Sequence, residues 1–200
     1  MGHPDLSDPS PGPLALVLAD QPPYVPLERL LERHVDVVLC LGDLSHQALE
    51  PLGGARVPKL GVHGNHDDGD EFTGLGIEDV HLRRVDVAGL CFGGFSGSVR
   101  YRGGLRYAWT QRRASRALTR LGPVDVLIAH SPPAGVNDDP DDPAHTGLDG
   151  LRAYVERERP ALVLHGHTYP ILPASRLGPT QVLHVRGHRF VRLPMAGRAR

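Results

Sequence analysis

Apolar residues fall in short runs along this chain, and five of these runs predict buried β-strands. Each run is four to six residues long and is followed by Asp, Asn or His within a few positions, where the strand is expected to give way to a loop. The runs are Leu14–Ala19, Asp36–Leu41, Val57–Val62, Val124–Ala129 and Ala161–Leu164.

Segments with helical spacing alternate with these runs. Leu27–His34 and Ser45–Pro51 separate the first three strands, while Thr110–Leu121 and Leu148–Arg159 precede the last two. Strands that alternate with helices favour a mainly parallel sheet with helices on its faces. The sequence therefore predicts an α/β fold.

The pattern changes in the middle of the chain. Asp79–Phe95 contains short β-rich pieces separated by turn residues, which predicts an antiparallel excursion onto a second sheet. Gly93–Gly104 is rich in glycine and is expected to be a loop. Pro132–Thr146 is a second long loop, and loops of that length are usually functional or disordered. Val182–Val185 and Arg189–Leu193 are expected to be short antiparallel strands.

Length and charge limit the class of protein. Two hundred residues suit one domain, which we place at 14–194 with a flexible N-terminal tail at 1–13 and a C-terminal tail at 195–200. The formal net charge of −1 gives no indication of binding to nucleic acid or to a membrane. No segment is apolar enough to span a bilayer, and no signal pattern opens the chain, so a cytoplasmic location is expected.

Potential metal ligands gather after the predicted strands. A cluster of nitrogen and oxygen donors at strand ends is how an α/β sheet builds a metal site. The motifs are Asp20-Gln21-Pro22, Gly42-Asp43-Leu44-Ser45-His46, Gly64-Asn65-His66-Asp67, Ala129-His130 and Gly166-His167-Thr168-Tyr169.

The order of these motifs resembles the calcineurin-like metallophosphoesterase superfamily over nearly everything from Leu14 to Leu193. No motif is specific alone, but their order after apolar runs is specific. The resemblance implies a four-layer αββα sandwich with two mixed β-sheets. It also implies a two-metal site at the carboxyl ends of the strands, which hydrolyses a small phosphorylated substrate.

The resemblance also implies a role for each matching residue. Asp43 corresponds to the carboxylate that bridges the two metals, and Asn65, His130 and His167 correspond to the other ligands of one metal. We call these four residues the intact site. His66 corresponds to a histidine that does not bind metal but contacts the phosphate or protonates the leaving oxygen.

The ligands of the other metal depart from the family pattern. Proline at Pro22 and tyrosine at Tyr169 stand where the family has histidine, so this position, which we call the depleted site, keeps Asp20 and Asp43. His46 or the Tyr169 oxygen could replace the missing ligands; alternatively, His46 is a partner of His66 or an exposed helix residue. The implied cofactor is a divalent transition metal among Mn, Fe, Ni, Co and Zn, with one ion held tightly and a second more weakly.

Three interpretations remain open at this point. The protein is a phosphoesterase whose second metal is weak, a one-metal enzyme, or a silent member that binds metal or a phosphorylated ligand without turnover; a scaffold with a vestigial site is a further alternative. Arg100, Arg102 and Arg106 lie in a loop among three glycines and are candidates for substrate binding, Arg100 and Arg102 foremost, although a solvated basic loop would look the same. The sequence does not indicate an oligomeric state.

Overall fold

The computed structural model describes residues 12–195. Most of the predicted N-terminal tail, 1–13, and of the predicted C-terminal tail, 195–200, lies outside these described residues. Within residues 12–195, no helix has the length and apolar character needed to cross a membrane.

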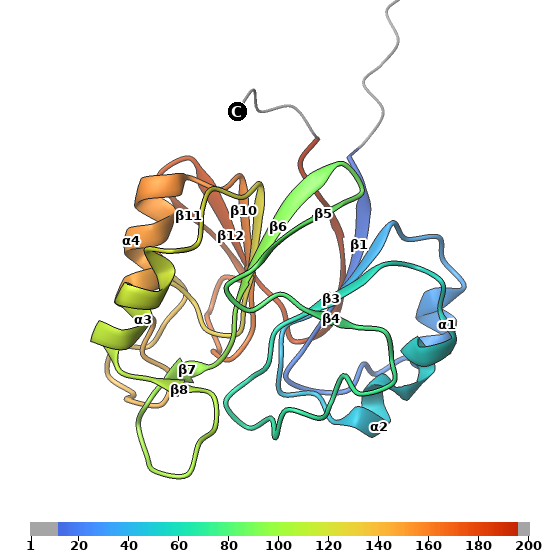
Figure 1. The fold of residues 1–200 in the computed structure, drawn as a ribbon, viewed down its shortest axis with the longest axis horizontal. Coiled ribbons are helices and arrows are strands. Elements are labelled where there is room, and N and C mark those ends of the chain that lie inside the picture. The colour runs from blue at the N-terminus through green and yellow to red at the C-terminus, as the bar shows by residue number, and fades with distance from the viewer. Residues whose placement is uncertain (1–11, 196–200) are drawn as a thin grey trace, which may run out of the picture.

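Two sheets face one another, and each carries helices on its outer face (Figure 1). The first sheet has the order β13 (Gly187–Arg192), β1 (Leu14–Ala19), β2 (Val37–Cys40), β3 (Lys59–Gly61) and β4 (Glu78–Asp79). The second has the order β11 (Ala174–Leu177), β12 (Thr180–His184), β10 (Leu162–His165), β9 (Val126–Ala129), β6 (Leu90–Phe95) and β5 (Arg84–Val87). Both sheets are mixed, because β13, β11 and β5 run antiparallel to their neighbours.

The helices are short. Helix α1 (Leu27–Leu31), α2 (His46–Leu49) and the 3₁₀ helix η1 (Glu50–Gly54) belong to the first sheet, and α3 (Gln111–Leu118) and α4 (Asp149–Glu158) cover the second. A two-stranded pair, β7 (Ser98–Val99) with β8 (Ala108–Trp109), completes the elements described.

Side chains of the central strands point alternately to the two faces of each sheet, and they build three hydrophobic layers. In β1, Ala15 and Val17 face the opposite sheet, whereas Leu16 and Leu18 face the helices. In β9, Ile128 points between the sheets. Because successive side chains of a strand point to opposite faces, a strand covered on both faces reads as a continuous apolar run. The predicted four-layer αββα sandwich is confirmed.

Several element boundaries differ from the sequence expectation. The predicted helix Ser45–Pro51 is instead α2 followed by η1, with Pro51 in the first turn of η1. The predicted Gly93–Gly104 loop is wrong at its start, since β6 continues through Gly93–Phe95. A Cβ at Gly94 would lie 2.7 Å from side-chain carbons of Val62 and Val80, so glycine allows the close packing that this strand needs.

Two expectations about strands also need correction. Val80–Leu82, one of the β-rich pieces expected within Asp79–Phe95, forms only an isolated bridge at His81. Leu82 adopts a positive φ of 54°, which breaks the strand. The strand predicted at Val182–Val185 is β12, which pairs in parallel with β10, and only its other edge pairs antiparallel, with β11. Strand β11 has no apolar run because it lies at the edge of the sheet.

His184 ends β12 with a buried side chain whose Nε2 has no hydrogen-bond partner. Burial lowers the pKa of His184 to about 4. An unfolded histidine has a pKa of about 6.5, so the unfolded chain binds a proton more readily. Protonation of His184 therefore favours the unfolded chain. The unfolding free energy has its full value above pH 6.5 and decreases as the pH falls toward 4.

We expect His184→Gln to flatten the acid side of the stability curve. Between pH 7 and pH 5, the wild type should lose up to about 2 kcal/mol more unfolding free energy than the variant does. Urea unfolding in the presence of a chelator measures this difference. The matched control is His34→Gln, because the His34 side chain is 90% exposed, and its curve should follow the wild type. Parallel curves for wild type and His184→Gln would contradict the prediction.

Candidate metal centre

Strands from both sheets deliver the candidate ligands to one edge of the sandwich. Asp20 directly follows β1 and Asp43 follows β2, both in the first sheet. His130 directly follows β9 and His167 follows β10, in the second sheet. Because parallel strands end at the same edge, side chains that are far apart in the sequence meet there.

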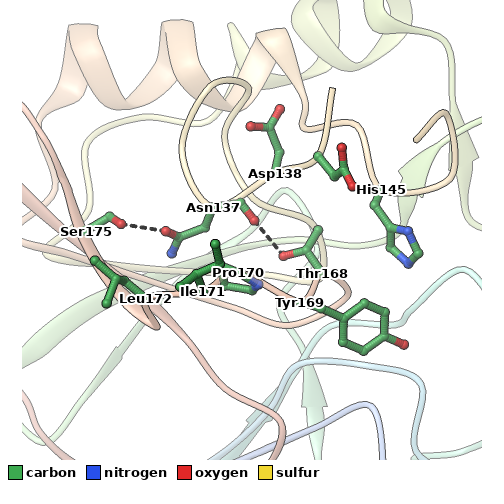
Figure 2. Close-up of a pocket in the computed structure, with 10 residues that line it drawn as sticks. Asn137, Asp138, His145, Thr168, Tyr169, Pro170, Ile171, Leu172 and Ser175 are labelled. Atoms are coloured by element: carbon green, nitrogen blue, oxygen red, sulfur yellow. Dashed lines mark hydrogen bonds between the residues drawn. The ribbon is translucent and has the colours of Figure 1, made fainter. Parts of the chain in front are cut away.

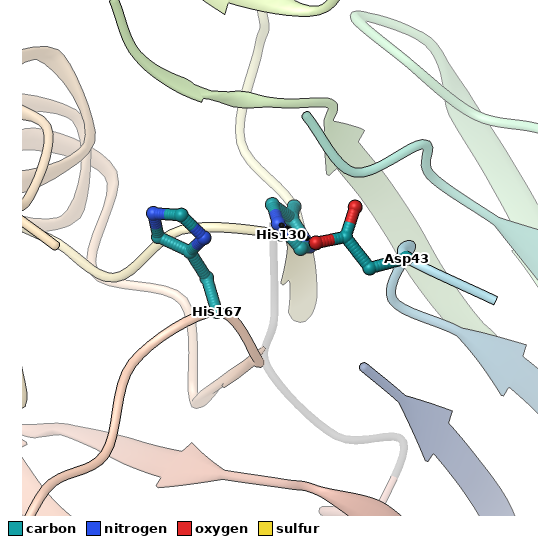
Figure 3. Close-up of side chains that lie close together, drawn as sticks. All are labelled: Asp43, His130 and His167. Atoms are coloured by element: carbon teal, nitrogen blue, oxygen red, sulfur yellow. Dashed lines mark ion pairs between the residues drawn. The ribbon is translucent and has the colours of Figure 1, made fainter. Parts of the chain in front are cut away.

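Four side chains of the intact site converge. His130 Nε2 lies 3.0 Å from Asn65 Oδ1 and 3.4 Å from Asp43 Oδ2. Asp43, His130 and His167 each offer a ligand atom, and these atoms lie within 4.8 Å of one another (Figure 3). Two imidazole nitrogens and two oxygens around one point form a donor set suited to Zn, Mn, Fe, Co or Ni.

Backbone carbonyls orient both imidazole rings. His130 Nδ1 donates to the Leu41 carbonyl at 2.8 Å, and His167 Nε2 donates to the Ala144 carbonyl at 2.7 Å. Only a protonated nitrogen can donate to a carbonyl, so in a neutral ring the other nitrogen carries the lone pair. His130 Nε2 and His167 Nδ1 are therefore the nitrogens available to a metal. Such outer hydrogen bonds are characteristic of histidine ligands.

The charges at the intact site favour a cation. Burial would raise the pKa of Asp43, but the adjacent His130 outweighs burial and lowers this pKa to about 2. Burial would lower the pKa of His130, but Asp43 and Asp20 outweigh it and raise this pKa to about 9. For His167, burial dominates and lowers the pKa to about 3. The half-buried Asp43 carboxylate thus faces Nε2 of His130, and a proton or a metal ion between these two groups is stabilised.

The loops that carry these ligands are tightly joined. Asp67 Oδ2 accepts hydrogen bonds from Gly64 N at 2.7 Å and from Asp43 N at 3.1 Å. Asp43 Oδ1 accepts from His66 N at 2.9 Å, which leaves Oδ2 facing His130. A Cβ at Gly64 would lie 2.0 Å from Asp43 Oδ1, so only glycine permits this approach.

Three candidate ligands have left-handed backbone conformations. The φ angles are 63° at Asp20, 54° at Asp43 and 68° at His167. Non-glycine residues adopt this region rarely, and such strain clusters at functional sites. For Asp the cost is small, whereas for His167 the conformation needs the support of its neighbours.

One such support comes from Asp20, the remaining carboxylate particular to the depleted site. Both Asp20 oxygens lie 2.9 Å from His167 N, which donates to them, and Oδ1 lies 3.9 Å from His130 Nδ1. Burial raises the pKa of Asp20 to about 6. Asp20 therefore holds the His167 loop in place as well as lining the depleted site.

The two positions that replace family histidines face solvent. Pro22 is exposed, and the Tyr169 side chain is 64% exposed with its ring against His145 and Arg186. His46 is also exposed, and its Nδ1 lies 3.1 Å from the Glu71 carbonyl. The role of His46 as a replacement ligand stays a prediction.

An open cleft of about 430 Å³ lies over the site and is lined in part by Asp20, Asp43 and His66. His66 is exposed, with its backbone fixed by Asp43. Arg100 and Arg102 are not among the residues that line this cleft. Arg100 reaches the Ala108 carbonyl at 3.5 Å, and Arg102 packs over the Tyr101 ring.

A different arginine approaches the cleft. Arg106 donates to the carbonyl of Asp68, a residue that lines the cleft. The sequence shows that arginines gather in this loop, but it does not show which of them turns toward the third motif. The substrate-binding role of Arg100 and Arg102 stays a prediction.

Sequence reasoning missed a buried cluster beneath the third motif. His63 Nδ1 lies 3.1 Å from Glu71 Oε2 and 3.7 Å from Asp67 Oδ2, and its ring is stacked between Phe72 and Tyr107. Glu71 also accepts from Asp68 N and Gly69 N. These contacts fix the loop that carries Asn65 and His66. The spacing of His63, Asp67 and Glu71 by four residues was the available signal.

Comparison with known proteins agrees with this geometry. The family described as calcineurin-like phosphoesterase matches residues 23–170. No curated protein matches the chain by sequence. One solved structure superimposes with a TM-score of 0.67 at 16% identity, over 92% of this chain and 100% of the other.

Two further solved structures are similar to this chain. The protein TT1561 of Thermus thermophilus has a TM-score of 0.61 at 16% identity, over 86% of this chain and 88% of its own. Vps29 of Entamoeba histolytica, complexed with zinc, is more distant, with a TM-score of 0.43 at 18% identity over 86% of this chain and 72% of its own. At such identities the likeness shows the fold alone.

We expect Asp43→Asn to remove more bound metal than Asp20→Asn. Asp43 is predicted to bridge both metals, whereas Asp20 is predicted to bind only the metal of the depleted site, and Asn tolerates the positive φ at either position. The loss of affinity at Asp43 should exceed the roughly 10–100-fold that an outer-shell substitution costs. Mass spectrometry of metals after dialysis measures the content. Equal losses in the two variants would argue that Asp43 does not bridge.

We also expect unequal metal occupancy in the wild type. The ion at Asn65, His130 and His167 should survive dialysis, whereas the ion at the depleted site should not, because that site offers mainly carboxylate oxygen. Restoring nitrogen ligands by Pro22→His with Tyr169→His should raise the affinity for the second metal, with circular dichroism as the folding control. Two tightly held metals per wild-type chain would contradict this picture, and His46 would then be the first replacement ligand to test.

Proposed function

This chain belongs to the calcineurin-like phosphoesterase family, and on that premise we propose that it is a metal-dependent phosphoric ester hydrolase. The substrate is a small phosphorylated molecule, either a phosphomonoester or a phosphodiester. The tightly held cofactor is one divalent transition metal at the intact site, among Mn, Fe, Co, Ni and Zn, and a second metal binds more weakly.

One observation carries the proposal. Asn65 Oδ1 and Asp43 Oδ2 lie 3.0 Å and 3.4 Å from His130 Nε2. The carbonyls of Leu41 and Ala144 fix the outer nitrogens of His130 and His167. A site whose ligands are oriented in advance needs little rearrangement to bind a metal. The Nδ2 group of Asn65 is buried without a partner, which a purely structural asparagine would not leave.

The reaction exchanges one P–O bond for another. Water oxygen bonds to phosphorus, the P–O bond to the leaving group breaks, and the leaving oxygen takes a proton. A divalent metal held by Asp43, Asn65, His130 and His167 would supply hydroxide at neutral pH and would polarise a phosphoryl oxygen. The chain itself orients the phosphate through His66, whose side chain projects into the open cleft.

His66 is suited to proton transfer because its backbone is held while its ring is free. The backbone N–H donates to Asp43 Oδ1, so the residue has a fixed distance from the intact site. Its exposed side chain is free to contact a phosphate, or the leaving oxygen bonded to that phosphate, beside Asp43. Positioned histidines contribute about 10²–10⁴-fold to proton-transfer steps.

A second candidate function follows from the depleted site. Pro22 and the exposed Tyr169 leave that site without nitrogen ligands at those positions, which favours a protein that binds one metal or a phosphorylated ligand with little turnover. The two functions differ in a simple measurement. Purified protein is analysed for metal content and assayed with a general phosphodiester and a general phosphomonoester across Mn, Ni, Co and Zn.

The outcomes of that assay separate the candidates. Turnover that follows the metal content and disappears in Asp43→Asn supports the hydrolase. One bound metal without turnover under any of these metals supports the binding protein and overturns the hydrolase. Protein that neither binds metal nor turns over either ester overturns the hydrolase and favours a scaffold with a vestigial site.

We expect His66→Ala to lower turnover by about 10²–10⁴-fold while leaving bound metal nearly unchanged. The variant keeps the backbone hydrogen bond to Asp43, because that bond does not involve the side chain. Steady-state kinetics and metal analysis of the same preparation give both quantities. His34→Ala removes an exposed histidine elsewhere and is the control. Loss of metal from His66→Ala would show that His66 is a ligand.

A further inference from the structure

A pocket of about 460 Å³ lies beside the intact site, and His145 stands between the two. The His145 ring lines this pocket, with its centroid 5.3 Å from the His167 ring and 5.2 Å from the Tyr169 ring. A hydrogen bond of 2.6 Å from Nδ1 to Asp142 holds the ring in place. Thr168, which directly follows His167, also lines the pocket, so the pocket adjoins the intact site.

One wall of the pocket is apolar and open to solvent. Tyr169, Ile171 and Leu172 are 64%, 98% and 69% exposed. Figure 2 shows this segment running along the pocket from the Tyr169 ring to Leu172. Pro170 and Pro173 flank the two aliphatic residues and restrict the backbone. Large apolar side chains held exposed beside a pocket mark a ligand site.

The Tyr169 ring has a fixed orientation. The Arg186 guanidinium lies over it at 4.8 Å from the ring centroid, and the His145 ring meets it edge to face. A ring held from two directions loses little freedom when a ligand packs against it. Tyr169 thus provides an apolar contact surface at the position where the family has a metal-binding histidine.

The polar groups of the pocket are acceptors. Asp138 Oδ2 accepts from Gly147 N and Asp139 Oδ1 accepts from Asp141 N, so each carboxylate keeps a second oxygen. Asn137 is occupied, because its Oδ1 accepts from Ser175 and its Nδ2 donates to His165. The residues that line the pocket include no Lys or Arg. The Arg186 guanidinium touches the pocket only through the outer side of its wall, at the Tyr169 ring, so the free oxygens of Asp138 and Asp139 favour N–H donors within the pocket.

We propose that this pocket holds the leaving group of the substrate, and that the leaving group carries a flat heterocycle with an amino group, as in a nucleoside phosphate. The heterocycle packs on Tyr169 and Ile171, its amino group donates to Asp138 or Asp139, and the phosphate lies at the intact site. The proposal rests on the proposed hydrolase function, because only a hydrolysed substrate has a leaving group, but the binding itself can be measured without turnover.

The test is calorimetry with three ligands on manganese-loaded His66→Ala protein, in which turnover is slowed. Cytidine 5′-monophosphate and uridine 5′-monophosphate differ mainly in the amino group, and ribose 5-phosphate lacks the base. We expect the cytidine ligand to bind at least about tenfold more tightly than ribose 5-phosphate, with the uridine ligand between them. Equal affinity for the two nucleotides, or for cytidine monophosphate and ribose 5-phosphate, would overturn the proposal.

Further substitutions in the His66→Ala protein test whether the preference for cytidine monophosphate arises in this pocket. Ile171→Ser should reduce the ratio of cytidine monophosphate to ribose 5-phosphate affinities several-fold, and it should fold because Ile171 is 98% exposed. Met195→Ser removes another exposed apolar side chain outside the pocket and should leave the ratio unchanged. An unchanged ratio in Ile171→Ser would place the base elsewhere and overturn the proposal.

The outcome is separable from that of the proposed function. A preference for cytidine monophosphate in a protein that hydrolyses no ester supports the pocket while the hydrolase fails. Hydrolysis of esters by the wild type with no preference among the three ligands overturns the pocket while the hydrolase stands.

Discussion

The hydrogen bond from His130 to the Leu41 carbonyl is the contact on which the site depends. Leu41 follows β2 in the first sheet, and His130 follows β9 in the second. The bond therefore joins the two sheets at the edge where all the candidate ligands emerge. It also selects the imidazole nitrogen that faces Asn65 and Asp43. Packing between the sheets and the chemistry of the site are set by the same atoms.

Two carboxylates of the motifs act through the backbone. Asp67 joins the second and third motifs by accepting from Asp43 N and Gly64 N, and Asp20 holds the His167 loop through His167 N. The buried His63 cluster supports the loop that carries Asn65 and His66. Asp20 thus has a structural role at His167 that does not depend on whether a metal binds beside it.

The sequence predicted the parts of the fold that depend on local pattern. Strands covered on both faces, such as β1 and β9, read as apolar runs, and the order of the motifs predicted the sandwich. It did not predict β11, which is a polar edge strand. It also did not predict that β6 continues through Gly93 and Gly94, because the fit of Gly94 depends on Val62 and Val80 of the opposite sheet. Nor did it show that Arg106, among the three candidate arginines of its loop, is the one that approaches the cleft, since the direction of a loop is set by its tertiary contacts.

The candidate ligands of the intact site come from both sheets, so a bound metal would affect how easily the protein unfolds and is degraded. An ion bound by Asp43 and His167 would cross-link segments at opposite ends of the chain, as a disulfide does, and would oppose separation of the sheets. Ligand binding to the folded state lowers the unfolded fraction that proteases remove. Scarcity of the metal would then lower the abundance of the protein, and its cellular level would report the supply of that nutrient.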